Sequence, residues 1–178
     1  MAKKASRRLV IDASVARACG GEQTQHPTGT RCREFLEAVR TISHQLVMTP
    51  AISEEWRRHQ SRAARKWRVQ MYARRKVCWV EPPIDDSLEQ RINRVKGTAA
   101  EREGMLKDLP LIEAAKVTDE AINSLDDKVR RILARASEYI VELRSIVWVN
   151  PDQPAEDPIG WLQRGAKPER ERMLGSGV

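Results

Sequence analysis

The feature that most constrains the fold is a regular alternation of short apolar runs with longer segments of helical spacing. The apolar runs have the length of buried strands and cover residues 9–11, 46–48, 77–80, 121–125 and 145–149. Helical spacing covers residues 30–43, 52–76, 86–96, 108–116 and 127–139, and Gly97 and Gly104 are expected to break the chain in between. Because apolar strands separated by helices form parallel sheets, the sequence predicts a three-layer α/β/α fold around a parallel sheet of about five strands.

The chain has 178 residues, of which 40% are hydrophobic, so it is long and apolar enough to bury the core of one domain. We assign residues 1–150 to this domain. Residues 151–178 form a tail that four prolines punctuate. Within the tail, Asp157 and Pro158 predict the start of a short helix that carries Trp161 and Leu162.

Targeting and membrane segments are not predicted. No window approaches the ~18 apolar residues of a membrane helix, and the apolar run behind the basic N-terminus is too short for a signal-peptide core. Cys19, Cys32 and Cys78 lack the CxxC spacing of zinc and redox motifs. Three free thiols suit a reducing compartment, so we expect a cytoplasmic protein with no membrane partner.

The charge favours a polyanionic partner. The net charge is +7 and the pI about 9.7, which suits RNA, DNA or an anionic membrane surface, although plain solubility is the simpler alternative. Residues 57–76 contain nine Arg or Lys residues and no acid. The residues assigned to nucleic-acid binding are Arg57, Arg58, Arg62, Arg65, Lys66 and Arg68. The apolar stripe of the same predicted helix, which includes Trp56 and Trp67, is assigned to core or dimer contacts rather than to base stacking.

Four carboxylates lie at the ends of predicted elements. Asp12 ends the first strand, Glu55 opens the basic helix, Asp108 opens the helix over 108–116, and Asp126 follows the fourth strand. Such positions can meet at the carboxyl edge of a parallel sheet, where sites form. Taken singly, Asp108 could be only a helix cap and Asp126 only a turn residue. Together, four carboxylates would repel one another unless a cation offset their charge, and oxygen ligands favour Mg²⁺ or Mn²⁺ over zinc. The sequence therefore predicts a metal site suited to phosphodiester cleavage.

The contexts of the four acids resemble the motifs of the PIN-domain ribonucleases, over roughly residues 8–150. The segments are VIDASV at 10–15, PAISEEW at 50–56, DLPLIEAA at 108–115 and SLD at 124–126. The resemblance implies a PIN-like fold and a Mg²⁺- or Mn²⁺-dependent endoribonuclease that acts on single-stranded or structured RNA and prefers single strands. It also implies a homodimer and a toxin held by an antitoxin protein. The long basic helix and the tail depart from a minimal PIN toxin.

The resemblance implies that Asp12, Glu55, Asp108 and Asp126 are metal ligands and catalytic residues. It further implies that Ser14 and Ser124 orient ligands or water. Two neighbouring pairs of acids stay open: Glu54 or Glu55, and Asp126 or Asp127. We prefer Glu55 because it directly precedes Trp56, and Asp126 because it follows Ser124 by two residues.

Two other functions are compatible with parts of the sequence. The first is a catalytically inactive PIN-like module that binds RNA or protein. The second is a phosphatase of the haloacid-dehalogenase type, but that chemistry needs a second Asp two residues after the first, and Ser14 at this position argues against it. Asp119 is expected on the surface at the opposite edge of the sheet. The three histidines, His26, His44 and His59, are assigned to structural or surface positions.

Overall fold

Each strand of the sheet coincides with one of the short apolar runs. The structure, a computed structural model, describes residues 6–177. The strands are β1 Arg8–Ile11, β2 Gln45–Met48, β3 Val77–Trp79, β4 Ala121–Asn123 and β5 Val147–Val149. They form one all-parallel sheet in the order β3-β2-β1-β4-β5. The predicted parallel α/β/α fold is confirmed.

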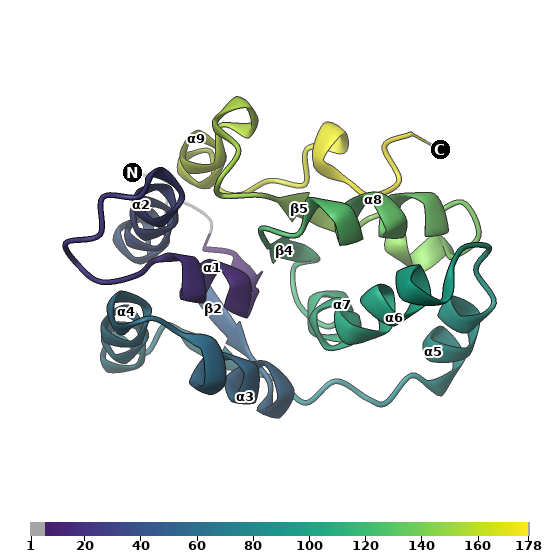
Figure 1. Ribbon diagram of the computed structural model, residues 1–178. Helices are drawn as coiled ribbons and strands as arrows, with labels where there is room; N and C mark the ends of the chain where they lie inside the picture. Colours follow the sequence, from purple (N-terminus) through teal and green to yellow (C-terminus); the bar gives the residue numbers. More distant parts are fainter. Residues whose placement is uncertain (1–5, 178) are drawn as a thin grey trace.

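Helices cover both faces of this sheet (Figure 1). They are α1 Ala13–Ala18, α2 Pro27–Ile42, α3 Pro50–His59, α4 Arg62–Ala73, α5 Asp86–Asn93, α6 Ala99–Lys107, α7 Leu109–Lys116, α8 Asp127–Ala136 and α9 Pro158–Gln163. Three 3-10 turns, Val141–Leu143, Pro154–Glu156 and Arg170–Arg172, complete the described elements. In Figure 1, α1 to α4 gather on one side of the strands and α5 to α8 on the other. Within residues 6–177, no helix combines the length and the apolar character that a membrane crossing requires.

The long helix predicted over residues 52–76 is wrong, because the chain breaks between α3 and α4. Gln60 has extended backbone (φ −60°, ψ 137°), and the side chain of Ser61 accepts a hydrogen bond from the Ala64 N–H, which starts a new helix. The turn brings the rings of Trp56 and Trp67 into a stack with centroids 6.1 Å apart. Both rings are buried, so the assignment of this apolar stripe to the core is confirmed.

Two other helix predictions need correction. Gly104 does not break the chain but lies inside α6, whose first turn is a capping box formed by Thr98 and Glu101. A Cβ built at Gly104 would lie 3.5 Å from the Val129 side chain, which is an ordinary van der Waals contact, so the packing of α6 on α8 does not itself require a glycine here. Helix α2 begins at Pro27, three residues earlier than predicted, because proline is well tolerated in the first turn of a helix.

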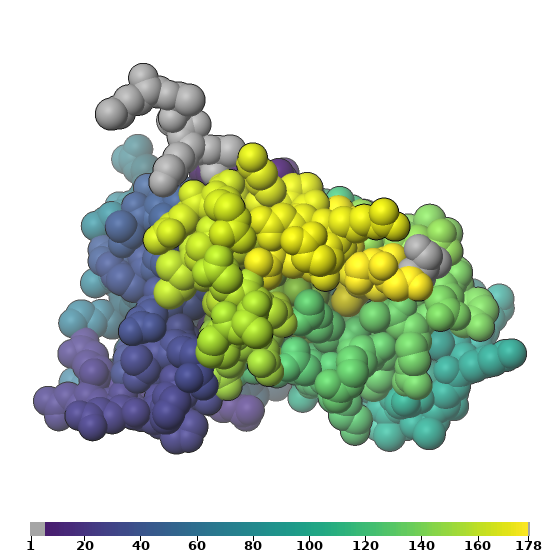
Figure 2. Space-filling model, turned by 90° about the horizontal axis from the view of Figure 1, so that it is seen from above, coloured from purple at the N-terminus to yellow at the C-terminus, as the bar shows by residue number. Residues whose placement is uncertain are grey.

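The segment after residue 150 packs along the rest of the molecule. The predicted short helix forms as α9, with the Asp157 side chain accepting a hydrogen bond from the Gly160 N–H. Trp161 and Leu162 are fully buried, and α9 packs against α2. Further on, Met173 pairs antiparallel with Val147 of the edge strand β5. Figure 2 shows this C-terminal segment spread across one face of the molecule.

His44 connects the N-terminal strand to α9. Its ring is fully buried, its Nδ1 accepts a hydrogen bond from the Arg7 N–H at 3.0 Å, and its Nε2 donates to the Leu162 carbonyl oxygen at 3.0 Å. The ring is therefore neutral, since a protonated Nδ1 could not accept. Burial lowers the pKa of His44, and the nearby positive charges of Arg7 and Lys76 lower it further, although the bond to Leu162 opposes this.

We expect His44→Ala to reduce the free energy of unfolding by roughly 2–3 kcal/mol, because the buried Leu162 carbonyl and the partly buried Arg7 N–H lose their partner. In the native protein, the stability contributed by the neutral ring should be complete above the unfolded-state pKa of about 6.5 and should decline as the pH falls below it. Urea denaturation at pH 7.5 and pH 5.5 measures both effects. His26→Ala is the control, because that exposed side chain makes no capping hydrogen bond. An unchanged midpoint for His44→Ala would contradict this role.

Candidate active site

The register of the two central strands creates the site. Ile11 of β1 lies beside Asn123 of β4, so the next residues, Asp12 and Ser124, emerge together at the carboxyl ends of the strands. The Asp12 N–H donates to the Asn123 carbonyl oxygen at 2.9 Å, which fixes this alignment. The chain leaves β1 toward β2 on one side and returns to β4 on the other. This reversal of strand order is where open α/β sheets bind their ligands.

Two serines hold the carboxylate of Asp12. The Ser124 hydroxyl donates to Asp12 Oδ2 at 2.9 Å, and the Ser14 hydroxyl donates to the same oxygen. Each serine oxygen also accepts a backbone bond, Ser14 from the Leu125 N–H at 3.2 Å and Ser124 from the Asp126 N–H at 3.1 Å. The two serines thus fix the orientation of one carboxylate and tie β1 to the loop after β4.

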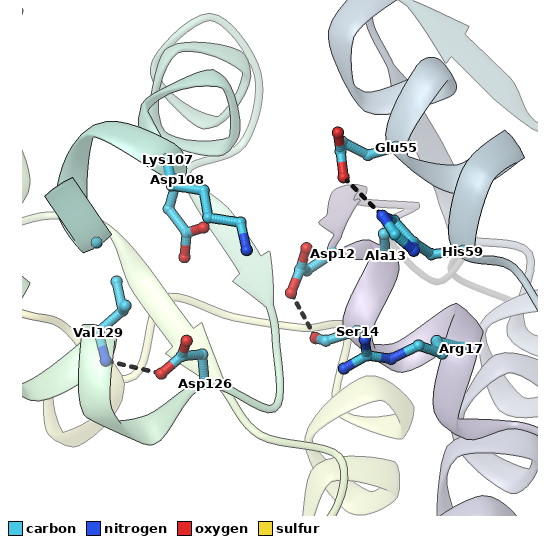
Figure 3. Close-up of a pocket in the computed structure, with 11 residues that line it drawn as sticks. Asp12, Ala13, Ser14, Arg17, Glu55, His59, Lys107, Asp108, Asp126 and Val129 are labelled. Atoms are coloured by element: carbon cyan, nitrogen blue, oxygen red, sulfur yellow. Dashed lines mark hydrogen bonds and ion pairs between the residues drawn. The ribbon is translucent and has the colours of Figure 1, made fainter.

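The four predicted acids line one cavity of about 250 Å³. Figure 3 shows their side chains around a common space, with Asp12 supplied from the end of β1 and Glu55 from α3. Asp108 lies at the junction of α6 and α7. Asp126 precedes α8, and its Oδ1 accepts from the Val129 N–H at 2.9 Å, so one of its two oxygens caps the helix. The acids come from four separate segments of the chain.

The two neighbouring pairs of acids differ in their contacts. Glu54 forms ion pairs with Arg57 and Arg58 and does not line the acidic cavity. Glu55 lines that cavity, although it also lies 3.4 Å from His59 and 3.8 Å from Arg58. Asp127 accepts hydrogen bonds from the side chains of Asn150 at 2.9 Å and Gln153 at 3.1 Å, and only Asp126 lines the cavity. The geometry favours Glu55 and Asp126 for any chemistry in this cavity.

The carboxyl of Asp108 lies in an unusual environment. Its Oδ2 is buried and has no hydrogen-bond partner among the described residues, and its side chain does not cap α7. Burial raises the pKa of Asp108 to about 7, and the negative charges of Asp12 and Asp126 add to the effect, while Lys107 partly offsets it. A buried carboxyl beside two other acids, with a free oxygen, is suited to binding a cation.

The donor atoms of the four acids are chemically suited to a divalent metal ion. These donors are all carboxylate oxygens, the ligands that Mg²⁺ and Mn²⁺ prefer, and the unpartnered Oδ2 of Asp108 supplies one ready donor. Within residues 6–177, however, no three His, Cys, Asp or Glu side chains already converge closely enough to hold an ion. Side-chain rotation would have to bring the oxygens together around the metal.

Three cationic or titratable side chains in the cavity were not predicted. Arg17, His59 and Lys107 all line it with the acids (Figure 3). His59 was assigned to a structural or surface position; it is exposed, but its Nε2 lies 3.4 Å from Glu55 Oε2. The four-residue spacing of Glu55 and His59, which puts both on one face of a helix, was the available signal. Arg17 and Lys107 carry no comparable signal.

Asp119 lies away from the site, at the opposite end of the sheet, as predicted. Its Oδ2 accepts from the Arg8 N–H at 2.7 Å, and its Oδ1 forms an ion pair with the Arg8 guanidinium at 2.8 Å. This carboxylate is partly buried rather than freely exposed, and its contacts connect the start of β1 to the segment before β4.

The basic segment is less uniform than its sequence suggests. Arg57 and Arg58 are paired with Glu54, and Lys66 with Glu22 at 2.6 Å. These pairs are exposed, so they are weak and open to competition by phosphate. Because α3 and α4 are separate helices, the predicted single positive face is divided between them.

Three arginines of α4 form fewer ion pairs than the other residues assigned to nucleic-acid binding. Arg62 and Arg65 are exposed, Arg68 is half-buried, and none of the three forms an ion pair with a residue of the described range 6–177. They remain candidates for contacts with a nucleic-acid backbone.

The cysteines take no part in the site. All three are free thiols, and burial raises the pKa of Cys19 and of Cys32 to about 12, so neither thiol forms a reactive thiolate near neutral pH.

Comparison of the chain with protein-family models, with curated proteins and with solved structures finds no match.

Proposed function

We propose that this protein is a metal-dependent endoribonuclease that cleaves phosphodiester bonds in single-stranded RNA, with a PIN-like active site. The observation that carries the proposal is the meeting of Asp12, Glu55, Asp108 and Asp126 in one cavity at the strand-order reversal. Asp108 adds a buried carboxylate oxygen without a partner. A hydrolase that acts on a phosphodiester needs such a cluster to assemble Mg²⁺ or Mn²⁺ beside the phosphate.

The side chains of the cavity have distinct roles in this proposal. Asp12 is the most rigid ligand, because Ser14 and Ser124 hold its carboxylate. Asp108, Asp126 and Glu55 would complete the donor set from three other segments. Bound Mg²⁺ or Mn²⁺ would supply a water of lowered pKa and offset charge on the phosphate.

The cations of the cavity serve the substrate. Arg17 and Lys107 lie among the acids, where each can bind a phosphate oxygen that the carboxylates would otherwise repel. Arg62, Arg65 and Arg68 would bind the strand farther from the cavity through its phosphates. The toxin role, the antitoxin partner and the homodimer are further proposals that rest on the sequence resemblance.

One observation favours a second candidate function, a catalytically inactive module that binds RNA. No three acids in the described range already converge on an ion position, and Glu55 is engaged by His59 and, at 3.8 Å, by Arg58. A protein without metal chemistry would bind RNA through its arginines and leave the strand intact.

A cleavage assay separates these two functions. We expect the purified protein to cut a pool of unstructured RNAs of defined sequence in Mn²⁺ and to leave the same pool intact in EDTA, because phosphodiester hydrolysis here depends on the ion. Activity should return when Mn²⁺ is restored in excess over the chelator. Binding of the pool without any divalent-dependent cleavage would favour the binding module. Equal cleavage with and without EDTA would rule out metal-dependent hydrolysis.

A further inference from the structure

A second cavity adjoins the acidic one and has a different character. It has a volume of about 320 Å³, at the small end of the roughly 300–1,000 Å³ typical of ligand pockets. Its apolar lining comes from the first turns of two helices, with Ala51 and Ile52 of α3 facing Pro110 and Leu111 of α7, and Trp56 behind them. The cavity is therefore a slot between α3 and α7.

The apolar part of the lining offers few polar contacts to an occupant, and the charged side chains that also line the cavity are Asp12, Glu54, Glu55, Lys107 and Asp108. Ile52, Trp56 and Leu111 are apolar and almost completely buried, so they form the fixed inner part of this lining. The indole N–H of Trp56 is already used, because it donates to the Ile11 carbonyl oxygen at 2.8 Å. Such walls fit a flat group with apolar faces better than a sugar or a charged group.

The two cavities are continuous. Asp12, Glu55, Lys107 and Asp108 line both of them, with the acids and Lys107 at the boundary. One molecule can therefore occupy both cavities, with one part in the apolar slot and a covalently attached part among the carboxylates. A nucleotide combines these two parts, because a phosphate carries the charge and a base supplies the flat group.

We propose that the slot between α3 and α7 binds one unstacked nucleobase of an RNA strand, next to the phosphate that lies among the acids. This inference rests on the proposed function, since it assigns the substrate's phosphate to the acidic cavity. Enzymes that bind an extruded base hold it between apolar or aromatic side chains, as this lining would. A base that is stacked and paired in a duplex cannot enter, so the slot selects single strands at the reacting position.

The test fills the slot and compares strands with and without bases. The probes are a fluorescein-labelled oligouridylate and an abasic oligoribose-phosphate of the same length and charge, bound in Ca²⁺ and checked by gel for integrity. We expect the native protein to bind the strand with bases about tenfold more tightly, as one stacked base would contribute. Ala51→Trp should abolish this ratio while the affinity for the abasic strand stays unchanged. Ala51 is exposed, so the larger side chain is compatible with folding.

A matched control is available in α6. Ala100 is also exposed and is also the second residue of its helix, but it lies outside both cavities, so Ala100→Trp should keep the tenfold ratio. Ala51→Leu, a smaller change, should give a partial loss. A ratio near one in the native protein, or a ratio that survives Ala51→Trp, would overturn the proposal.

Cleavage of the oligouridylate in Mn²⁺ is followed in parallel, so that the two proposals fail separately. Base-dependent binding that Ala51→Trp removes, without any cleavage, supports the base slot and refutes the nuclease. If the protein cleaves RNA but Ala51→Trp leaves the ratio of affinities for the two strands unchanged, the nuclease is supported and the base slot is refuted.

Discussion

Replacing Asp12 with asparagine is expected to leave a folded protein that no longer cleaves RNA at a useful rate. The asparagine oxygen can still accept hydrogen bonds from the hydroxyls of Ser14 and Ser124, so the local hydrogen bonds are kept. The negative charge that would bind the metal ion is lost. If the ion contributes several kcal/mol to the transition state, at about 1.4 kcal/mol per tenfold the rate should fall roughly a thousandfold or more.

The measurement is single-turnover cleavage of a defined RNA in Mn²⁺, together with thermal denaturation of both proteins. Asp119→Asn serves as the matched control, because it changes a carboxylate at the opposite end of the sheet whose hydrogen bonds within residues 6–177 all come from Arg8. That variant should lose stability and keep its rate per folded molecule. Ser124→Ala should lie between the two, about 10–100-fold slower, because the Asp12 carboxylate is less firmly oriented. Native-like cleavage by Asp12→Asn would refute the proposed active site.

The second large expected effect is a gain in stability when another acid of the site, Asp108, is replaced. We expect Asp108→Asn to be more stable than the native protein in EDTA at pH 8, by roughly 2–4 kcal/mol. The pKa of Asp108 is about 7 in the folded chain and near its ordinary value of 3.8 when the chain is unfolded. Ionising this carboxyl therefore costs free energy only in the folded state. The cost is absent below about pH 4, grows between pH 4 and pH 7, and is complete above pH 7.

Urea denaturation of both proteins across pH 4 to pH 8 follows this dependence. The stability difference should be largest at pH 8 and should shrink toward pH 4, where both side chains are neutral. Asp85→Asn is the control of opposite sign, because the pKa of Asp85 is lowered by its hydrogen bonds to Lys116 and the Leu88 N–H. A constant difference between the two proteins at every pH would contradict the role of ionisation.

Added Mn²⁺ should reverse the ranking. An ion that binds only the folded chain stabilises it by mass action, and the native protein has the carboxylate that the variant lacks. The same residue would thus weaken the metal-free protein and strengthen the metal-bound one.

The sheet and its acids were predictable because they depend on local features. Short apolar runs predict strands, and the carboxyl ends of neighbouring parallel strands lie at the same edge of the sheet. Asp12 and Ser124 therefore meet as a direct result of the β1–β4 register. The local pattern does not specify the order of the strands in the sheet, by contrast.

The break between α3 and α4 could not be predicted in this way. Neither Gln60 nor Ser61 is a strong helix breaker, and the residues around them keep helical spacing. The turn is favoured by contacts distant in sequence, such as the Ser61 N–H donating to the Ala16 carbonyl oxygen at 3.1 Å. The stacking of Trp67 on Trp56 has the same tertiary origin.

The environment of Asp108 was equally hidden. Asp108 lies directly after α6, a helix that was not predicted because Gly104 was expected to interrupt it. In the folded chain Gly104 continues α6 beside Val129 of α8 and forms no turn. The unusual pKa of the site therefore follows from tertiary packing.

The two edges of the sheet are not equivalent, and this limits how copies of the chain can associate through their strands. Met173 pairs with Val147, and the Leu174 N–H donates to the Ile146 carbonyl oxygen at 2.9 Å, so the β5 edge is capped from within. Within residues 6–177, no strand pairs with the outer side of β3. A sheet with a single open edge can add one neighbour of its own kind and then has no further edge to offer. Strand-mediated association would end as a closed pair rather than grow into a fibre.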